Sequence, residues 1–149
     1  MDGQHAPRAL RWTGGVRIDG RAVVRGILAA ALCGVGTLHF VPSSARTMAA
    51  IVPPAVERRS PVSTRAIVQI TGVCELAGAA GLLLPATRPV AGAALIVFYA
   101  CVFPANAYAA RHPERFGRVA VPFGRRLAFQ VFVVLLTAWG SFEPRGRRR

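Results

Sequence analysis

The stretch AIVQITGVCELAGAAGLLL, residues 66–84, decides the class of fold that this chain can adopt. It carries one charged side chain, Glu75, and otherwise consists of apolar, small and uncharged polar residues. A helix of about 20 predominantly apolar residues crosses the hydrocarbon core of a bilayer, and about 17 to 25 are tolerated. The stretch therefore predicts a membrane-spanning helix with an acid near its middle.

Three more uncharged stretches surround it, although the chain has a formal net charge of +13 and is 53% hydrophobic. The last stretch is the shortest, and Arg125 and Arg126 before it can extend their side chains to the headgroups. We expect four spans at about residues 24–41, 66–84, 90–110 and 127–142. The predicted fold is all-α, an integral membrane four-helix bundle.

One domain, residues 22–142, accounts for most of the chain. Residues 1–21 predict a basic, disordered leader, and residues 143–149 an arginine-rich tail. A cleaved signal peptide is the alternative for the start, but three further spans favour a retained first helix. All 19 basic residues are arginine. They are scattered over every loop without interleaved aromatic residues, so a lipid bilayer is the expected partner and a nucleic acid is not.

The connections between the spans constrain the topology. Residues 41–65 contain four prolines and cannot form one continuous helix, while the apolar Met48–Val52 inside them is expected at the membrane interface or inside the bundle. The short Pro85–Pro89 connection predicts a tight turn between antiparallel neighbours. Arginine numbers on the two sides are nearly equal and leave the orientation open.

Each span carries one polar side chain that lipid does not solvate, namely Glu75, His39, Asn106 or Gln130. The last three lie near span ends that face the same side. Glu75 lies nine residues into its span, about 14 Å deep at 1.5 Å per residue. The sequence therefore predicts three polar groups around one mouth with an acid beneath them, and His39 and Glu75 could form a buried pair.

Small residues surround Glu75 on its helix face, among them Gly72, Gly78 and Ala79. Small residues let helices approach closely, so this face is expected to pack against other helices. Glu75 is then either a protonated acid with a structural hydrogen bond or a group for proton relay or ligand anchoring. The first span has a similar stripe, formed by Gly26, Ala30 and Gly34.

Pro104 removes a backbone donor from the third span and frees the carbonyl group of Ala100, one turn before Asn106. Such a break is either a structural kink or part of a cavity wall, and a cavity of about 300 Å³ or more would favour a ligand. The three cysteines fall in different spans without a Cys-x-x-Cys pair, so packing is their expected role.

Signatures of common catalytic and metal sites are missing from the sequence. There is no glycine-rich phosphate loop, no metal-ligand spacing and no nucleophile elbow. His5 and His112 lie outside the spans, which excludes two-histidine haem ligation within the bundle. We expect no metal and no nucleotide enzyme.

Several short motifs occur in an order that resembles the DoxX-like family of small four-helix membrane proteins. They lie within residues 36–106 and include GTLHF, IVPP, TGVCE, GLLLPATR and VFPAN, which begin at Gly36, Ile51, Thr71, Gly81 and Val102. The resemblance implies a four-helix bundle with both termini in the cytoplasm. The family name comes from a subunit associated with quinone-linked sulfur oxidation, and some bacterial relatives are implicated in membrane-associated redox and thiol-stress complexes.

Three functional hypotheses follow from these observations. The first is an accessory subunit of a membrane redox assembly, quinone- or thiol-linked, rather than a stand-alone enzyme. The second is a pocket around Glu75 that binds a quinone, a lipid or another small amphiphile, or that passes a proton or solute. The third is a structural membrane scaffold without a ligand.

Overall fold

The computed structural model describes residues 19–117 and 120–142, and these residues form helices without a β-strand. The all-α prediction is therefore confirmed. Residues 1–18 of the expected leader and the expected tail, residues 143–149, lie outside the described ranges. The helices are α1 (Gly20–Leu38), α2 (Pro42–Ala50), α3 (Pro54–Arg59), α4 (Thr64–Leu83), α5 (Arg88–Arg111), α6 (Pro113–Phe116) and α7 (Phe123–Ser141).

Of the described helices, α1, α4 and α5 are long and apolar enough to cross a membrane, which suggests a membrane protein. The fourth expected span corresponds to α7, which has 19 residues but is not in this group. Arg125, Arg126 and Gln130 occupy its first two turns and lower the mean hydropathy there. Length and composition thus support three crossings directly.

The first helix begins and ends earlier than the expected span at residues 24–41. The side chain of Asp19 accepts a hydrogen bond of 3.0 Å from the backbone nitrogen of Arg21 and caps the start of α1. After Leu38 the chain turns, and Pro42 starts α2, where its fixed φ suits a first helical position. The connection predicted to be broken by prolines therefore contains two short helices, α2 and α3.

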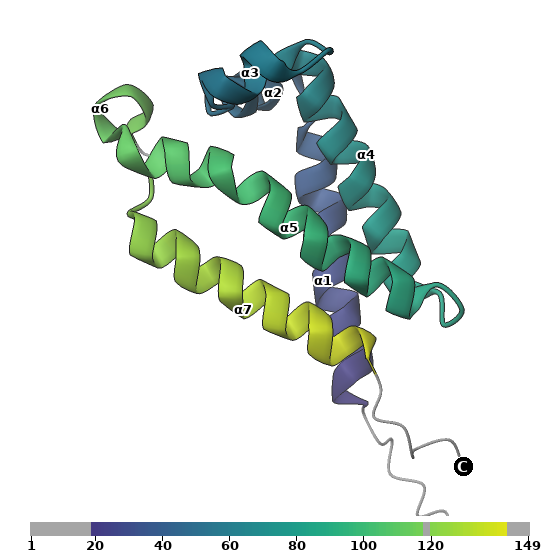
Figure 1. Ribbon diagram of the computed structural model, residues 1–149. Coiled ribbons are helices and arrows are strands. Elements are labelled where there is room, and N and C mark those ends of the chain that lie inside the picture. The colour runs from purple at the N-terminus through teal and green to yellow at the C-terminus, as the bar shows by residue number, and fades with distance from the viewer. Residues whose placement is uncertain (1–18, 118–119, 143–149) are drawn as a thin grey trace, which may run out of the picture.

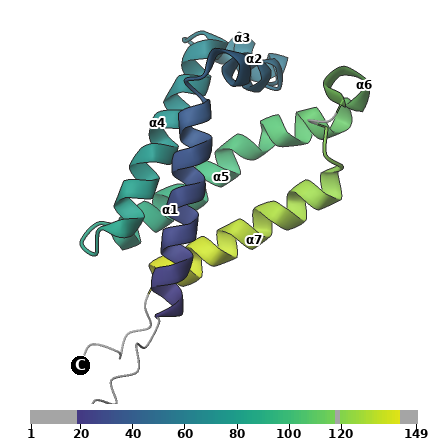
Figure 2. The same ribbon diagram turned by 180° about the vertical axis from the view of Figure 1, so that it is seen from behind.

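The four long helices form two antiparallel pairs, α1 with α4 and α5 with α7 (Figure 1). The predicted tight turn joins α4 to α5, so that these two helices are neighbours as well. The pair α5–α7 runs obliquely to α1–α4, and the helices meet at one end and diverge at the other in both views (Figure 2). Helices α2 and α3 lie across the diverging end of α1 and α4.

Arginine side chains fasten the start of α1 to the end of α7. Arg21 Nη1 donates hydrogen bonds of 2.6 and 2.7 Å to the carbonyl oxygens of Trp139 and Phe142. Arg25 is 7% exposed, and its Nη1 donates to the carbonyl oxygen of Gly140 at 3.1 Å. The last carbonyl groups of a helix have no partner within the helix, so cations are favourable there.

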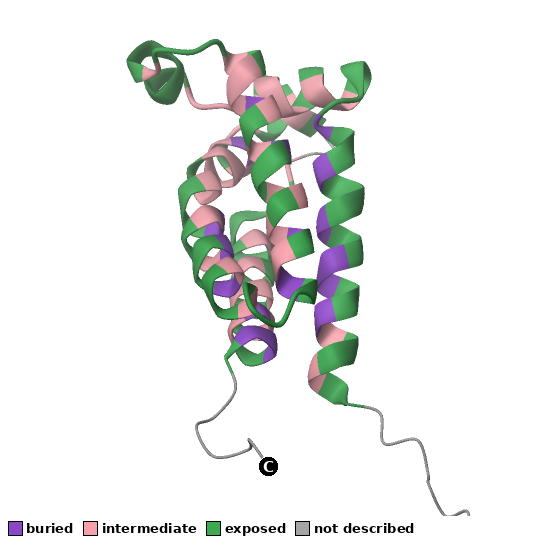
Figure 3. Ribbon diagram, turned by 90° about the vertical axis from the view of Figure 1, so that its right-hand side faces the viewer, coloured by how far each residue is buried: buried purple, intermediate pink, exposed green. Residues whose placement is uncertain are grey.

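The buried core is small and lies where the four long helices meet. It includes Leu28, Leu32, Leu82, Leu95 and Tyr99. Many large apolar side chains lie on the outer surface instead. The outer face of α1 is exposed along its length (Figure 3). Surfaces of this kind are typical of contact with lipid or another protein. The large exposed apolar side chains include Ile27, Val90, Val97, Phe129 and Leu135.

The small residues of α4 lie in the tightest helix contacts. A Cβ atom at Gly72 would lie 2.6 Å from the Cβ of His39, and one at Gly78 would lie 2.5 Å from Leu95 Cδ2. Ala79 is fully buried. These positions therefore allow α4 to approach both α1 and α5.

The packing face expected for α1 needs correction. Gly26, Ala30 and Gly34 are exposed, and a Cβ atom at either glycine would meet no other atom within 4 Å. The face of α1 that packs against α4 contains Ala29 and Gly36 instead. Apolar and small residues occur around the whole circumference of α1, so the sequence pattern does not single out the buried face.

Candidate functional site

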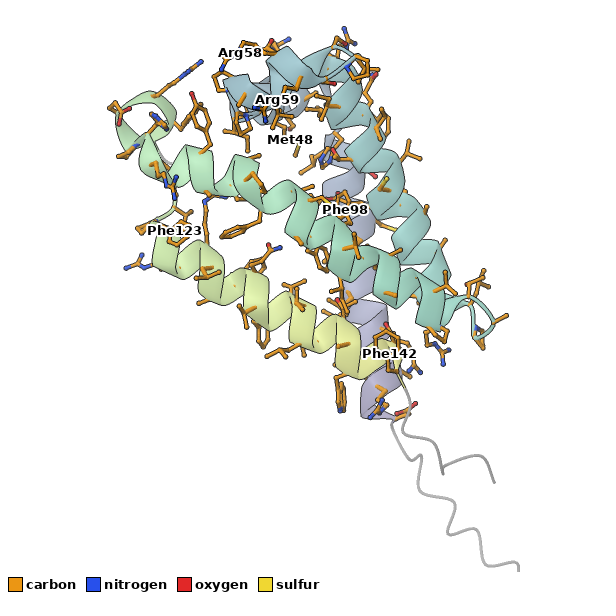
Figure 4. The ribbon with its side chains drawn as sticks, viewed as in Figure 1. Met48, Arg58, Arg59, Phe98, Phe123 and Phe142 are labelled. Atoms are coloured by element: carbon orange, nitrogen blue, oxygen red, sulfur yellow. The ribbon has the colours of Figure 1, made fainter. Side chains whose placement is uncertain are left out.

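A cavity of about 560 Å³ lies where the helix pairs diverge, between α4, α5 and the α2–α3 segment. Met48 on α2 extends toward it from above, and Phe98 lies where α5 passes α1 and α4 (Figure 4). Its wall is mostly aliphatic and aromatic, and Ile70, which lines it, is 53% exposed, so the cavity opens to the surface. Its volume is in the range of about 300–1,000 Å³ found for small-molecule sites.

His39 and Glu75 lie next to each other in this wall, at the junction of α1 and α4. The distance between His39 Nδ1 and Glu75 Oε2 is 3.5 Å, and the two side chains are 10% and 12% exposed. His39 Nδ1 also lies 2.9 Å from the carbonyl oxygen of Val35. A carbonyl oxygen only accepts hydrogen bonds, so His39 Nδ1 carries the hydrogen and donates it to Val35, the nearer of the two oxygens.

Glu75 is the buried polar group with an unused hydrogen-bonding atom at this site. Its Oε2 atom is inaccessible to solvent and has no hydrogen-bond partner among the residues that the structure describes. A buried carboxyl oxygen without a partner costs free energy, on the order of 1–3 kcal/mol or more. Glu75 lines the cavity with the part of its side chain that is still exposed, 12% in all. A small shift of the carboxyl group would let it accept a hydrogen bond from a molecule in the cavity or, as an acid, donate one to it.

Asn106 also lines the cavity, from the far part of α5. Its Oδ1 atom accepts a hydrogen bond of 2.7 Å from Arg126 Nη1 on α7, which ties α5 to α7 at the diverging end. Its amide nitrogen is the remaining polar group of this side chain. Asn106 thus lines the cavity and also holds α5 against α7.

Gln130 lies away from the lining of this cavity. Its Nε2 atom donates a hydrogen bond of 2.6 Å to the carbonyl oxygen of Tyr99, just before the position where Pro104 interrupts the α5 ladder. Pro104 itself lines the cavity. The structure therefore brings together His39, Glu75 and Asn106, while Gln130 satisfies the backbone of α5.

Sequence reasoning missed the apolar part of the wall. Cys74 and Cys101, expected to pack, are exposed and line the cavity, whereas Cys33 is exposed elsewhere on α1. Met48, from the segment expected at the interface or inside the bundle, and Phe98 complete the wall. Apolar residues of a membrane helix carry no signal that separates a cavity wall from a lipid-facing surface.

A family model matches residues 28–141 of the chain. The chain belongs to this family, a domain of unknown function (DUF8561). No curated protein and no solved structure matches the chain.

The DUF8561 match begins within α1 and ends at the last residue of α7, so it covers the whole cavity and its polar wall. Asp19, Arg21 and Arg25, which fasten the start of α1, precede the match. Within the described part of the chain, no group of three or more histidine, cysteine or acidic side chains lies close enough together to hold a metal ion.

Proposed function

We propose that the protein is a multi-pass protein of the cell membrane in which α1, α4, α5 and α7 each cross the bilayer and both termini are cytoplasmic. Helices α1, α4 and α5 are apolar and long enough to cross a membrane. Helix α7 is as long as α1, with 19 residues. The arginine contacts hold the start of α1 and the end of α7 together, as an even number of crossings requires. The cytoplasmic side rests on the resemblance to the DoxX-like family.

Within this membrane protein, the cavity is the binding site of a small amphiphile such as a quinone or a lipid. The observation that carries this proposal is the buried Glu75 carboxyl group, whose Oε2 has no hydrogen-bond partner in the described part of the chain and lies 3.5 Å from His39 Nδ1, in the wall of a cavity of about 560 Å³. A carboxyl group and an imidazole exchange hydrogen bonds with carbonyl or hydroxyl oxygens. The apolar wall accommodates a ring or an acyl tail.

Binding rather than catalysis is the function proposed for these residues. The polar groups that line the cavity are a carboxyl, an imidazole, an amide, the hydroxyl of Thr71 and two separate thiols. These groups can form hydrogen bonds with a ligand headgroup. A reaction at this site would need a cofactor or co-substrate that these side chains do not provide. A proton carried between Glu75 and His39 remains compatible with the same site.

Glu75→Gln tests this proposal because it keeps the shape of the side chain and removes the acid. We expect the variant, purified in mild detergent, to bind the short-tailed quinone decylubiquinone about tenfold or more weakly, measured by ligand-induced change in thermal midpoint. Glu114→Gln, at an exposed acid on α6, is the matched control. Unchanged quinone binding by a folded Glu75→Gln protein would make the acid structural and favour a scaffold.

Ala105→Phe provides a second test that does not depend on the acid. Ala105 lines the cavity and is partly buried, so a phenyl ring there occupies ligand volume without removing a polar contact. We expect decylubiquinone binding to be lost in this variant as well. Equal binding by the variant and the parent protein would place the ligand elsewhere.

A second candidate function is an accessory subunit of a membrane redox assembly, quinone- or thiol-linked. It is favoured by the positions of the DoxX-like motifs, because four of the five motifs contribute residues to the cavity wall. A pull-down in mild detergent is expected to recover an oxidoreductase subunit. A strictly solitary protein under these conditions would argue against this role and leave ligand binding as the function. The residues that these four motifs contribute to the wall include His39, Pro53, Glu75 and Asn106.

A further inference from the structure

A second, smaller cavity of about 180 Å³ lies beside His39, next to the start of α4 and under α2. Arg46 of α2 and Arg65 and Gln69 of α4 line it, together with apolar residues and without an acidic side chain. Because His39 lines both cavities, its side chain forms a wall that they share. The two cavities thus offer a cationic compartment beside an apolar one.

We propose that this small cavity binds the phosphate group of an anionic membrane phospholipid. The proposal rests on the membrane placement proposed above, and it names a lipid headgroup site distinct from the Glu75 cavity. Arginine presents its donors in a planar fork that matches the oxygens of a phosphate.

The two arginines are available for such a ligand. Neither Arg46 nor Arg65 makes a hydrogen bond or ion pair with another residue in the described part of the chain, whereas Arg21 and Arg25 donate to helix carbonyl groups. Both are exposed side chains. Two unpaired guanidinium groups beside one small cavity leave positive charge that the described part of the protein does not neutralise.

The local charge favours an anionic ligand over a cationic one. Residues 41–65 contain four arginines and one acid, Glu57, which gives the segment a formal charge of +3. Glu57 does not line the cavity, and its Oε1 accepts a hydrogen bond of 3.1 Å from Thr64 Oγ1. The volume corresponds to about six water molecules at about 30 Å³ each, enough for a phosphate group and part of its hydration.

The depth of the cavity favours a lipid over a free anion. Arg65 lies in the first turn of the apolar helix α4, and α2 lies across the ends of α1 and α4 (Figure 1). In a membrane, the ends of apolar helices lie at the level of the headgroup phosphates, and with both termini cytoplasmic this end of α1 and α4 lies in the outer leaflet. Two arginines at that level can hold a lipid phosphate by charge-assisted hydrogen bonds. A phospholipid held there by its phosphate has its acyl chains beside the exposed apolar side chains of α1 and α4.

The test compares two double variants with the same change in charge. Arg46→Gln with Arg65→Gln removes both cavity arginines, and Arg58→Gln with Arg59→Gln removes two arginines of α3 that line neither cavity. Binding of dioctanoyl phosphatidylglycerol to the purified full-length chain is measured by native mass spectrometry. We expect about 30-fold weaker binding for the first variant, and a change below about threefold for the second.

Three outcomes would overturn the proposal. If both double variants lose phosphatidylglycerol binding equally, the lipid is attracted only by the total charge of the protein. If phosphatidylcholine binds as tightly as phosphatidylglycerol, the site does not select for a net negative charge on the lipid. Inorganic phosphate that binds as tightly as the lipid and displaces it would make the site one for a free anion. A version with Arg46→Lys and Arg65→Lys, which keeps the charge, controls for folding and is expected to bind with intermediate affinity.

The same preparations separate this proposal from the proposed amphiphile site. The Arg46→Gln and Arg65→Gln protein should still bind decylubiquinone, and the Glu75→Gln protein should still bind phosphatidylglycerol. Loss of lipid binding with quinone binding retained supports the headgroup site whatever the fate of the Glu75 proposal. Retained lipid binding in the arginine variant overturns the headgroup site alone.

Discussion

Gly72 on α4 lies so close to His39 at the end of α1 that a Cβ atom at position 72 would be 2.6 Å from the Cβ of His39. The same Cβ would be 3.0 Å from the carbonyl oxygen of Gly36. Because glycine has no Cβ atom, Gly72 allows α1 and α4 to approach closely at the point where His39 contacts Glu75.

Gly72→Ala is expected to destabilise the protein, because the methyl group has no space and α1 or His39 must shift. Overpacking of this kind costs about 1–3 kcal/mol, against a helix-propensity gain of about 0.5–1 kcal/mol. Gly26→Ala is the matched control, since a Cβ there meets nothing within 4 Å. Thermal midpoints in detergent should fall for the first variant only; a rise in both would show that α1 can move away freely.

Arg25→Gln should loosen the end at which α1 and α7 meet. The change removes a buried charge-assisted bond to the carbonyl oxygen of Gly140 and a 3.4 Å ion pair with Asp19. A hydrogen bond to a charged group contributes about 1.5–3 kcal/mol, while the ion pair contributes less because Asp19 is exposed. Unfolding in detergent should detect the loss, and Arg58→Gln on α3 should leave stability within about 0.5 kcal/mol.

Pro104→Ala and Pro89→Ala form a pair within one helix. Proline in a helix interior costs about 3 kcal/mol, whereas proline in the first turn is well tolerated. Pro104 lies inside α5 and Pro89 in its first turn. We expect Pro104→Ala to raise the thermal midpoint and Pro89→Ala to leave it unchanged. If Pro104→Ala lowers the midpoint, the break in the α5 ladder is needed for packing.

Thiol labelling offers a direct check on occupancy of the large cavity. Cys74 and Cys101 line it and Cys33 does not, and all three are exposed. In variants that retain one cysteine each, saturating decylubiquinone should slow maleimide labelling at the two cavity positions but not at Cys33. Equal rates with and without the quinone at every position would show that it binds elsewhere.

Reporter fusions address the number of crossings. With four crossings, reporters at both chain ends give the same cytoplasmic signal, and one inserted after Ser60, between α3 and α4, gives the opposite signal. If α7 lies along the surface instead, the two ends report different sides. The result therefore decides whether α7, the long helix outside the group of three candidate spans, crosses the membrane.

The positions of the long helices could be predicted from sequence because long apolar stretches with very few charged residues mark their interiors. Glu75, His39 and Asn106 could be singled out for the same reason, since a polar side chain in an apolar helix is conspicuous. The face of α1 that packs against α4 could not be predicted from sequence, because apolar and small residues occur all around this helix. The bonds from Arg21 and Gln130 end on backbone carbonyl groups, which every residue possesses and no sequence pattern marks.

The convergence of the helix pairs at one end has a mechanical consequence. The α4–α5 turn and the arginine contacts between α1 and α7 both lie at that end. A rotation of one helix pair relative to the other would therefore have its axis there. Helix α5 has 24 residues, about 36 Å at 1.5 Å per residue, and a rotation of about 5° moves its far end by about 3 Å. The width of the cavity thus depends on an angle set at the opposite end of the molecule, where small changes in arginine contacts are magnified.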